Sequence, residues 1–426
     1  MPNVTNPSPE GPSRATPSLN PVSTKVLIVG AGPAGTACAT ELHRAGADVL
    51  VIDKAAFPRD KCCGDGLTTS ALRHLEHLGF DLGRVPNASA CTDVFVHSPG
   101  RRTVSLSLPD DGTRYAVITP RIELDQALVT HCRDLGIEVR EQAPLLSVDD
   151  NGPGAVTVTI GGLGTMAFDW VVAADGMWSP TRKMLGLSTD GYLGEWHAFR
   201  QYIGNATGPA SRELHVWFEE DLLPGYAWSF PLPGNRVNFG FGMLRESGRS
   251  VQHMNDLWRD LLARPHIVEV LGHGFEPEGR HTAWPIPARV DDAVRSSGRV
   301  LFVGDAVCAT DILTGEGIGQ ALETGMLAAR AITEGASAPD VRARYSQLID
   351  RNFVADHRMS STLGRWLSGR RVTESVLRLV NLNGWTRRNF VRWMFEDEPR
   401  AALFTPRRWH RGFLRRSGAY GGADAH

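Results

Sequence analysis

The chain of 426 residues has few cysteines, and their spacing excludes two classes of protein. Its six cysteines form neither the paired spacing of a zinc site nor a C-x-x-C redox motif. Cys62 and Cys63 are adjacent, which does not suit a disulfide framework. We therefore expect reduced thiols in a cytoplasmic protein, and we predict no metal site.

The sequence also lacks a strong net charge and any long apolar run. Its formal net charge of −2 argues against a nucleic-acid partner. No stretch reaches the roughly 18 apolar residues of a membrane-spanning helix. Residues 1–24 are rich in Pro, Ser, Asn and Thr without an apolar h-region, which predicts a disordered leader rather than a signal peptide. The expected localisation is cytoplasmic, with peripheral contact at the inner membrane face left open.

Apolar residues make up 42% of the chain, which is enough for a packed core, and the length of 426 residues predicts two or three lobes. Short β-branched runs at residues 25–29 and 49–52 flank a helical segment over residues 30–43, which predicts a βαβ unit. A helix over residues 67–78 has Asp65 and Thr68 as candidate caps. Further elements are expected at residues 122–135, 138–140, 156–160, 170–173 and 300–303 and after Gly315.

Two later parts of the chain have a different pattern. From about residue 191 to residue 287 strands and turns dominate, with one helical insert near residues 251–262. Residues 351–416 are expected to be helical. This order predicts a sheet lobe inserted into an α/β domain, followed by a helical region.

The most specific motif is G-x-G-x-x-G at residues 30–35, between the first strand and its helix. Gly30 permits the tight turn, Gly32 lets the backbone approach a pyrophosphate, and Gly35 lets the helix pack against the strand. An acid about 20 residues further on binds a ribose hydroxyl in such sites. The predicted dinucleotide-binding residues are Gly30, Gly32, Pro33, Ala34, Gly35, Asp53 and Lys54.

Two further segments resemble the FAD-binding segments of flavoprotein hydroxylases and reductases. They contain Asp175 and Gly176, and then Gly304, Asp305, Gly315, Gly317 and Ile318. The resemblance implies that Asp305 meets the ribityl or pyrophosphate part of FAD. It also implies that the backbone of residues 315–318 faces the isoalloxazine, where a helix start stabilises negative charge on reduced flavin.

Arg121 matches an arginine that these enzymes place over FAD. The alternative for Arg121 is a solvated charge at the start of a helix. Residues 57–67 resemble the K-x-C-G segment of the geranylgeranyl reductase family of FAD-dependent oxidoreductases, which implies that Cys63 and Gly64 lie near the flavin.

An aromatic strand carries the second resemblance to that family. Tyr226, Trp228 and Phe230 alternate, so their rings point to one face of an extended strand. The run matches the family's P-x-x-Y-x-W-x-F-P motif except at the leading proline, where Leu223 stands and Pro224 follows one residue late. The resemblance extends over about residues 25–330.

The family resemblance implies a hydroxylase-like α/β flavoprotein. It would have a Rossmann-like FAD-binding domain, an inserted antiparallel-sheet substrate domain and a C-terminal helical region. Such an enzyme reduces C=C bonds of an isoprenoid or other apolar substrate by hydride transfer from reduced flavin, with NAD(P)H or another reductant as electron donor. The predicted substrate-binding wall is Tyr226, Trp228 and Phe230. An isoprenoid substrate has almost no polar groups, so its binding site must be a long apolar groove.

The catalytic group is left open among Cys63, Tyr226 and Trp228. The Cys63 thiol could donate a proton or gate the flavin's redox state, or it could be a small residue that packs beside a glycine turn. The same scaffold supports FAD-dependent monooxygenases and halogenases that tailor secondary metabolites with NAD(P)H and O₂. Halogenases carry W-x-W-x-I-P at the equivalent strand, so Tyr226 and Phe230 disfavour halogenation.

The expected domain boundaries follow from these segments. Residues 25–90, 115–190 and 290–345 would form the FAD-binding domain, residues 91–114 and 191–289 the substrate domain, and residues 346–426 the C-terminal helical region. Residues 399–416 contain six arginines, no acid and interleaved aromatic residues, which is typical of a segment that contacts anionic lipid. A helix packed on the core is the alternative. The oligomeric state is not predicted.

Overall fold

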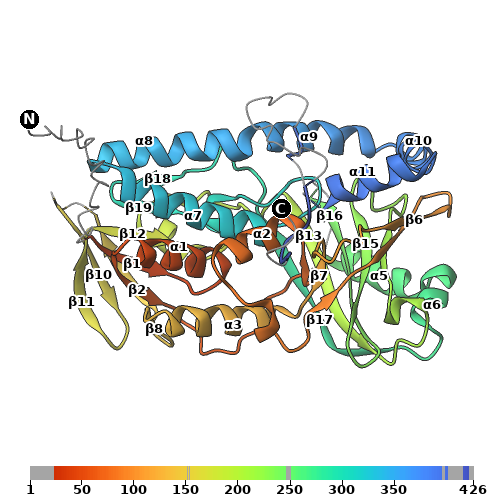
Figure 1. Cartoon of the computed structure of the whole chain (residues 1–426), viewed down its shortest axis with the longest axis horizontal. Helices are drawn as coiled ribbons and strands as arrows, with labels where there is room; N and C mark the ends of the chain where they lie inside the picture. The colour runs from red at the N-terminus through yellow and green to blue at the C-terminus, as the bar shows by residue number, and fades with distance from the viewer. Residues whose placement is uncertain are drawn as a thin grey trace, which may run out of the picture.

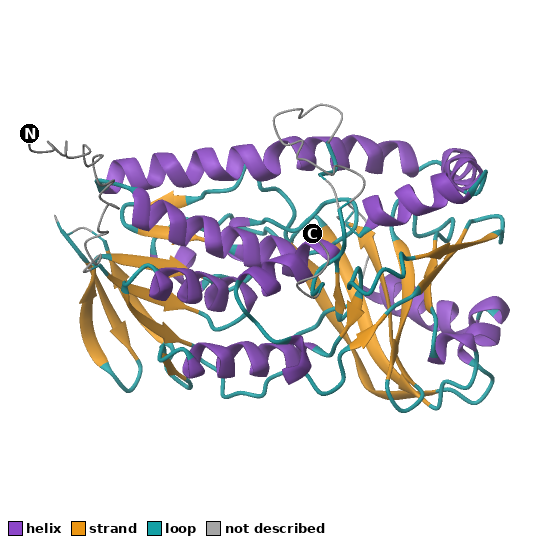
Figure 2. Ribbon diagram, in the orientation of Figure 1, coloured by secondary structure: helices purple, strands orange, loops and turns teal. Residues whose placement is uncertain are grey.

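A computed structural model describes residues 24–150, 152, 154–245, 251–395, 399–401 and 416–421. The molecule is elongated, with an α/β half at one end and a large sheet at the other (Figure 1). Helices cover the α/β half and extend along one long side of the molecule (Figure 2). The expected leader, residues 1–24, lies outside the described residues apart from Thr24.

A six-stranded sheet forms the centre of the α/β half. Its order is β18 (Ser296–Ser297), β19 (Val300–Phe302), β12 (Trp170–Ala173), β1 (Lys25–Val29), β2 (Asp48–Ile52) and β8 (Glu138–Arg140). All neighbouring pairs are parallel except β18 with β19. The βαβ unit expected from the first two apolar runs is confirmed.

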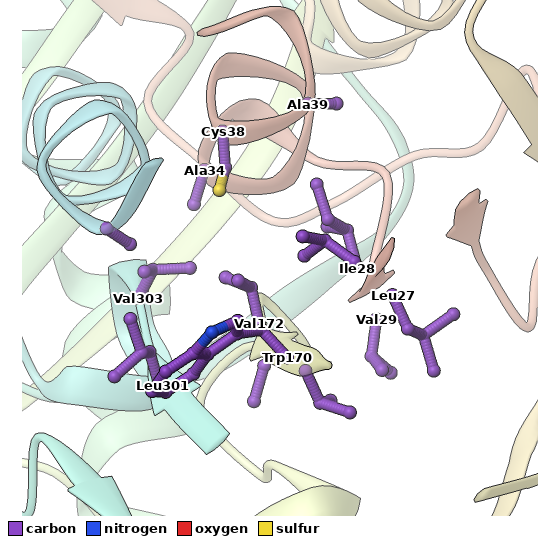
Figure 3. Packing of buried hydrophobic residues seen from close by; sticks show 14 of the residues in the cluster. Leu27, Ile28, Val29, Ala34, Cys38, Ala39, Trp170, Val172, Leu301 and Val303 are labelled. Atoms are coloured by element: carbon purple, nitrogen blue, oxygen red, sulfur yellow. The ribbon is translucent and has the colours of Figure 1, made fainter. Parts of the chain in front are cut away.

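Helix α1 (Pro33–Arg44) packs between this sheet and helix α7 (Ile318–Glu334). Figure 3 shows Ala34, Cys38 and Ala39 of α1 above the apolar side chains of β1, β12 and β19. The two helices approach closely, because a Cβ on Gly325 would lie 2.2 Å from the carbonyl oxygen of Ala34. Helix α3 (Arg121–Asp134) and helix α2 (Thr69–His77) complete this half.

A seven-stranded sheet forms the other end of the molecule. Its order is β17 (Glu276–Ile286), β13 (Trp196–Gly204), β16 (Arg236–Leu244), β15 (Tyr226–Leu232), β14 (Leu214–Trp217), β5 (Asp93–His97) and β6 (Thr103–Ser107). Every pairing is antiparallel except that of β5 with β14. Helices α5 (Val251–Ala263) and α6 (Pro265–Leu271) lie beside this sheet (Figure 1), and Trp258 packs on Phe239 and Phe241.

Two small sheets and several short elements fill the remaining space. One sheet joins β9 (Leu145–Asp149), β10 (Val156–Ile160) and β11 (Gly164–Phe168). The other joins β3 (Gly66–Leu67), β7 (Val117–Ile118) and β4 (Ser89–Ala90). The short elements are η1 (Leu82–Arg84), α4 (Pro180–Met184), η2 (Pro209–Ser211) and η3 (Gly304–Val307).

The C-terminal helices connect the two halves. Helix α8 (Ala338–Ile349), the π-helical segment η4 (Asp350–Val354) and α9 (Ala355–Leu367) follow one another along one side of the molecule (Figure 1). The proposed domain boundary after residue 345 therefore falls inside α8. Helices α10 (Arg370–Val380) and α11 (Gly384–Met394) then lie over the end of the large sheet (Figure 1).

The structure describes only part of the basic aromatic segment expected near the C-terminus. Residues 402–415, which carry most of the basic aromatic segment, lie outside the described residues. Residues 416–421 return to the core, where Ala419 forms a β-bridge with Arg114. In the described part of the chain, no helix combines the length and the apolar character that crossing a bilayer requires.

Candidate active site

A cavity of about 820 Å³ lies where the two halves of the molecule meet. Residues of both large sheets, of the glycine loop and of helices α9, α10 and α11 line it. Of the residues predicted from the sequence, the lining contains Gly30, Gly32, Pro33, Ala34, Asp53, Lys54, Cys63, Gly64, Arg121, Asp175, Gly176, Tyr226, Trp228, Phe230, Gly304, Asp305, Gly315, Gly317 and Ile318. Gly35 is outside the lining and packs behind it.

The glycine loop has one tight contact and one open face. Gly30 has φ +109°, a conformation that favours glycine, and its amide donates to the Ile52 carbonyl at 2.7 Å. A Cβ on Gly35 would lie 1.9 Å from the Gly30 carbonyl oxygen, so this position requires glycine for packing. A Cβ on Gly32 would meet only Arg59 Nη2, at 3.5 Å. The backbone at Gly32 is therefore open to the cavity.

Asp53 fastens this loop to the end of β2. Its Oδ2 accepts from the amide of Ala31 and its Oδ1 from the amide of Ala55, both at 2.9 Å. Asp53 is 8% exposed, whereas the neighbouring Lys54 is exposed at the cavity rim. Asp53 thus orients the loop amides from the position that the motif predicts for a ribose-binding acid.

Asp175 presents an unsatisfied oxygen. Its Oδ2 accepts from the amide of Thr181 at 2.9 Å, and its Oδ1 is buried without a hydrogen-bond partner among the described residues. Burial raises the pKa of this carboxyl group. The next residue, Gly176, has φ +80°, and a Cβ there would meet nothing within 4 Å. A ligand in the cavity could therefore satisfy Asp175 and approach the Gly176 backbone.

Asp305 lies in η3, opposite the K-x-C-G segment. Its Oδ2 is 2.9 Å from Lys61 Nζ, an ion pair across 244 residues of sequence. The amide of Gly304, which has φ +61°, donates to Thr324 Oγ1 at 2.9 Å. These contacts fix the turn between β19 and η3 at the floor of the cavity.

The start of α7 is capped by a residue that the sequence reasoning did not select. Glu316 Oε1 accepts from the amides of Ile318 at 3.0 Å and Gly319 at 3.1 Å. Glu316 lines the cavity, and burial raises its pKa to about 7. Its place between Gly315 and Gly317 in the predicted FAD segment was the available signal, but a one-dimensional motif does not reveal which way a side chain points.

Arg121 is a buried, paired side chain rather than a solvated one. It is 4% exposed, and its Nε and Nη2 bind the two carboxylate oxygens of Asp125 at 2.8 Å. Arg59 Nη1 reaches the same carboxylate at 3.1 Å, and Arg59 Nη2 lies 3.8 Å from Asp53 Oδ2. Two guanidinium groups thus share Asp125 beside the glycine loop, and guanidinium groups are the donors that bind phosphate or pyrophosphate.

The segment around Cys63 is held by a buried polar network. Asp65 Oδ2 accepts from Tyr202 at 2.8 Å and from Asn238 at 2.7 Å, and Asp65 Oδ1 accepts from the amide of Arg121 at 3.1 Å. Burial raises the pKa of Asp65 to about 6. The carbonyl of Cys63 accepts from Asn238 at 2.9 Å. The sequence offered Asp65 only as a candidate helix cap, and Thr68 fills that role by accepting from the amide of Ala71.

Burial also raises the pKa of the Cys63 thiol. The effect outweighs the nearby positive charge of Arg121, which lowers the pKa. The thiol therefore stays protonated at neutral pH, which does not favour a thiolate redox gate.

The three aromatic side chains of β15 form one continuous wall of the cavity. The ring centroids of Tyr226 and Trp228 are 6.0 Å apart, and those of Trp228 and Phe230 are 6.2 Å apart. The Tyr226 hydroxyl donates to the carbonyl of Thr314, beside the start of α7. Trp228 Nε1 donates to Asn238 Oδ1 at 3.1 Å, so its polar atom is satisfied away from the apolar face.

The wall touches the cysteine segment directly. A Cβ on Gly66 would lie 3.1 Å from Phe230 Cε2, and one on Gly64 would lie 3.3 Å from the same atom. The two segments that resemble the geranylgeranyl reductase family, far apart in sequence, are thus in van der Waals contact at the cavity.

Comparison with known proteins identifies the family. The family described as "FAD binding domain" matches residues 23–337. A menaquinone reductase of Mycolicibacterium smegmatis is 30% identical over 358 residues, which cover 77% of this chain and 81% of the relative. A digeranylgeranylglycerophospholipid reductase of Methanosarcina mazei is 27% identical over 329 residues, covering 74% of this chain and 76% of the relative.

The chain belongs to the geranylgeranyl reductase family of FAD-dependent oxidoreductases. Among solved structures, a geranylgeranyl bacteriochlorophyll reductase-like protein of Thermoplasma acidophilum has a TM-score of 0.74 and 20% identity, and the match covers 91% of this chain and 99% of that one. A flavin-dependent halogenase has a TM-score of 0.65 and 22% identity, with 91% and 76% covered. At these identities the structures establish the hydroxylase-like fold alone.

The residues of the cavity fit FAD, the cofactor of this family. The open backbone at Gly32 and the start of α1 suit the pyrophosphate, which binds where amides point outward. The unsatisfied Asp175 Oδ1 needs a hydrogen-bond donor, and the hydroxyl groups of FAD provide donors. When bound, FAD supplies hydride transfer. Among the described residues, no group of His, Cys, Asp or Glu side chains could hold a metal ion.

Proposed function

We propose that this oxidoreductase reduces C=C bonds in the isoprenoid chain of a prenyl lipid or prenylated quinone. One observation carries the proposal: the aromatic wall of Tyr226, Trp228 and Phe230 lines the same cavity as the residues predicted to bind FAD, and the cavity continues to apolar side chains of the C-terminal helices. The apolar residues at that far end are Leu363, Leu367, Val376, Leu377, Phe390, Trp393 and Met394.

The relatives support this choice of substrate. Their names describe reductases of menaquinone and of a digeranylgeranyl phospholipid, and both substrates carry isoprenoid chains. An isoprenoid chain binds through buried apolar area, at roughly 25 cal/mol for each Å² removed from water. A lining of aromatic and aliphatic side chains is therefore sufficient to hold it.

The side chains at the reaction end have separate tasks in this proposal. Trp228 and Phe230 hold the alkene flat against the flavin, and Tyr226 positions the Thr314–Gly315 turn through its hydrogen bond to Thr314. Cys63 and Tyr226 are our candidates for the proton that completes the reduction, since hydride and proton must reach different carbons of the alkene. Glu316 joins them, because it lines the cavity and its raised pKa lets it hold a proton near neutral pH.

Anaerobic turnover tests the proposal. Purified protein with bound FAD is reduced and mixed with menaquinone or a geranylgeranyl lipid, and the product is measured by mass spectrometry. We expect a gain of two hydrogens that fragment ions place in the isoprenoid chain, together with re-oxidation of the flavin. Two hydrogens gained on the quinone ring alone would mean reduction to the quinol and would contradict the proposal. Nicotinamides are compared with dithionite as reductants to identify the electron donor.

The aerobic arm of the same experiment distinguishes the other chemistries. A product that gains oxygen with NAD(P)H and O₂ would replace our proposal with a monooxygenase. Turnover that requires halide would replace it with a halogenase. Protein that purifies without flavin and binds none would contradict every one of these functions.

A further inference from the structure

Helices α9, α10 and α11 have two apolar faces, and only one of them lines the cavity. Thr373, Val376 and Leu377 of α10 point inward, where they line the cavity. Val372 and Leu379 lie on the outer side of the same helix, 42% and 60% exposed. Positions seven apart share a face of a helix, so these two side chains form one stripe.

Exposed apolar side chains also occur on both neighbouring elements. Trp366 at the end of α9 is 66% exposed, Leu382 in the α10–α11 turn is 68% exposed, and Trp385 at the start of α11 is 65% exposed. Large apolar side chains gathered in this way on a water-facing surface indicate an interaction site. We call the five residues Trp366, Val372, Leu379, Leu382 and Trp385 the apolar stripe.

Positive charge surrounds the apolar stripe. Residues 365–392 contain seven arginines and one acid, Glu374. That acid accepts from Arg370 at 3.3 Å and lies 3.6 Å from Arg378. Arg371 and Arg388 are exposed and form no ion pair with any described residue. This excess of positive charge complements an anionic surface.

We propose that the apolar stripe and its arginines are a docking surface for an anionic lipid membrane. Exposed Trp and Leu side chains insert at the boundary between headgroups and acyl chains, and arginines bind the anionic headgroups. The structure favours lipid over a protein partner, because the apolar side chains are interspersed with unpaired arginines and the same helices line the cavity on their inner side. Passage of a prenyl chain between these helices would follow, but that step rests on the proposed function.

Vesicle co-sedimentation of the full-length, FAD-bound protein tests the docking surface. Vesicles of phosphatidylcholine alone are compared with vesicles that also contain phosphatidylglycerol, at low and at high salt. We expect binding to the anionic vesicles that weakens as salt screens the charges. Two variants are informative: L379S/W385S, which removes apolar side chains, and R371Q/R388Q, which removes charge.

The charge variant should bind anionic vesicles at least about tenfold more weakly, since one surface arginine contributes about a fivefold factor to such binding. The apolar variant should lose binding at high salt first, because its remaining affinity is electrostatic. Leu146→Ser is the matched control: Leu146 is 56% exposed on β9, which pairs with β10 at the opposite end of the molecule (Figure 1), and its variant should bind like the unchanged protein.

Two results would overturn the docking surface. In the first, the unchanged protein and both variants bind vesicles equally, and the variant R407Q/R408Q/R411Q loses binding. The membrane contact would then lie in residues 402–415. In the second, the unchanged protein does not bind vesicles and is a dimer in solution, whereas L379S/W385S is a monomer. The apolar stripe would then be a contact between two copies of the chain. Flavin content and melting temperature confirm that each variant is folded.

Reduction of a detergent-solubilised prenyl substrate separates this inference from the proposed function. A variant that reduces the solubilised substrate normally but no longer binds vesicles supports both. Vesicle binding without any reduction would leave the docking surface intact and contradict the proposed function alone.

Discussion

The indole ring of Trp228 lies directly against the backbone of Gly240 on the neighbouring strand. The two residues are register partners in β15 and β16, and a Cβ on Gly240 would come within 2.3 Å of Trp228 Cζ2. The missing side chain lets the indole lie flat on the sheet, between Tyr226 and Phe230. Residue 240 thereby sets the orientation of the central ring of the wall, and the aromatic motif alone does not reveal this.

Gly240→Ala should displace the indole and destabilise the protein. The added methyl group would also lie 2.5 Å from the carbonyl oxygen of Phe199, so neither neighbour can yield easily. We expect a loss of about 1–3 kcal/mol in the free energy of unfolding and an altered near-ultraviolet circular dichroism spectrum. Gly242→Ala is the control, because its nearest contact would be 3.5 Å, to Trp196 Cε3. Equal stability of the two variants would contradict the close contact.

Gly32 and Gly35 should separate cofactor binding from folding. Gly32→Ala has space for its methyl group, so the apoprotein should keep its stability within about 0.5 kcal/mol while FAD binds at least about tenfold more weakly. Gly35→Ala places its methyl group against the Gly30 carbonyl, so the apoprotein itself should be destabilised. Thermal unfolding without FAD and flavin titration measure the two effects. A stable Gly35→Ala apoprotein would disagree with this assignment.

The sequence predicted the α/β half of the molecule well, because its strands and turns are determined by residues close together in the chain. Residues 25–29 form β1 as expected, and the turn at Gly30 follows from the spacing of the three glycines in residues 30–35. The Arg59–Asp125 ion pair joins segments 66 residues apart, and the Asp65–Asn238 hydrogen bond joins segments 173 residues apart. Such partners are chosen by the tertiary fold, so no pattern within one element could identify them.

The large sheet shows the same limit. Most of its strands were expected from the strand-and-turn pattern of residues 191–287, but the parallel pairing of β5 with β14 joins residues more than a hundred positions apart. The helical C-terminal region was predicted from composition, whereas the division of α10 into a cavity face and an exposed face required the structure. Periodicity reveals that a helix has two faces, and only its neighbours determine which face is covered.

Glu316 should make the protein less stable as the pH rises. Its pKa is about 7 in the folded state and near its usual 4.5 in the unfolded chain, so between these values the folded protein holds a proton that the unfolded chain has released. Stability therefore falls as the pH rises through this window and is constant above it. Glu316→Gln keeps an acceptor for the amides of Ile318 and Gly319 and removes the titration.

Urea unfolding at about pH 5.5 and about pH 8.5 measures this effect, which should be on the order of 1–3 kcal/mol. The Glu316→Gln variant should gain stability relative to the unchanged protein only at the higher pH. Glu269→Gln, an exposed substitution on α6, is the control and should show no such difference. A parallel shift at both pH values would argue against a raised pKa at Glu316.

A stacked histidine pair in the large sheet should have the opposite pH dependence. His97 Nε2 and His215 Nδ1 are 3.0 Å apart, and burial lowers the pKa of His97 to about 4 and that of His215 to about 3. Glu213 lies 3.2 Å from His215 but is 39% exposed, so burial remains the larger effect. The unfolded chain takes up protons below about pH 6.5 and the folded protein does not, so stability is lost as the pH falls below that value.

His215→Phe should flatten this acid dependence, because it removes one of the two titrating rings and keeps the stack with Phe95 and Trp217. Between about pH 6.5 and about pH 5 a single imidazole accounts for up to about 2 kcal/mol. Melting temperatures between about pH 7 and about pH 5 measure the slope. His273→Gln changes an exposed histidine and should leave the slope as it is. An unchanged slope in His215→Phe would mean that the pair already titrates normally.

Substitution at Val376 should shorten the chain that the enzyme accepts. Val376 lines the far end of the cavity, and the next residue back on α10, Ser375, is exposed. Val376→Trp fills the space that a long isoprenoid chain would occupy, so its reduction should slow at least about tenfold while a short prenyl substrate reacts as before. Ser375→Trp adds a tryptophan to the exposed side of α10 and should leave both rates unchanged. Equal loss on long and short substrates would show that the fold was disturbed, and no loss on either would show that the chain does not reach α10.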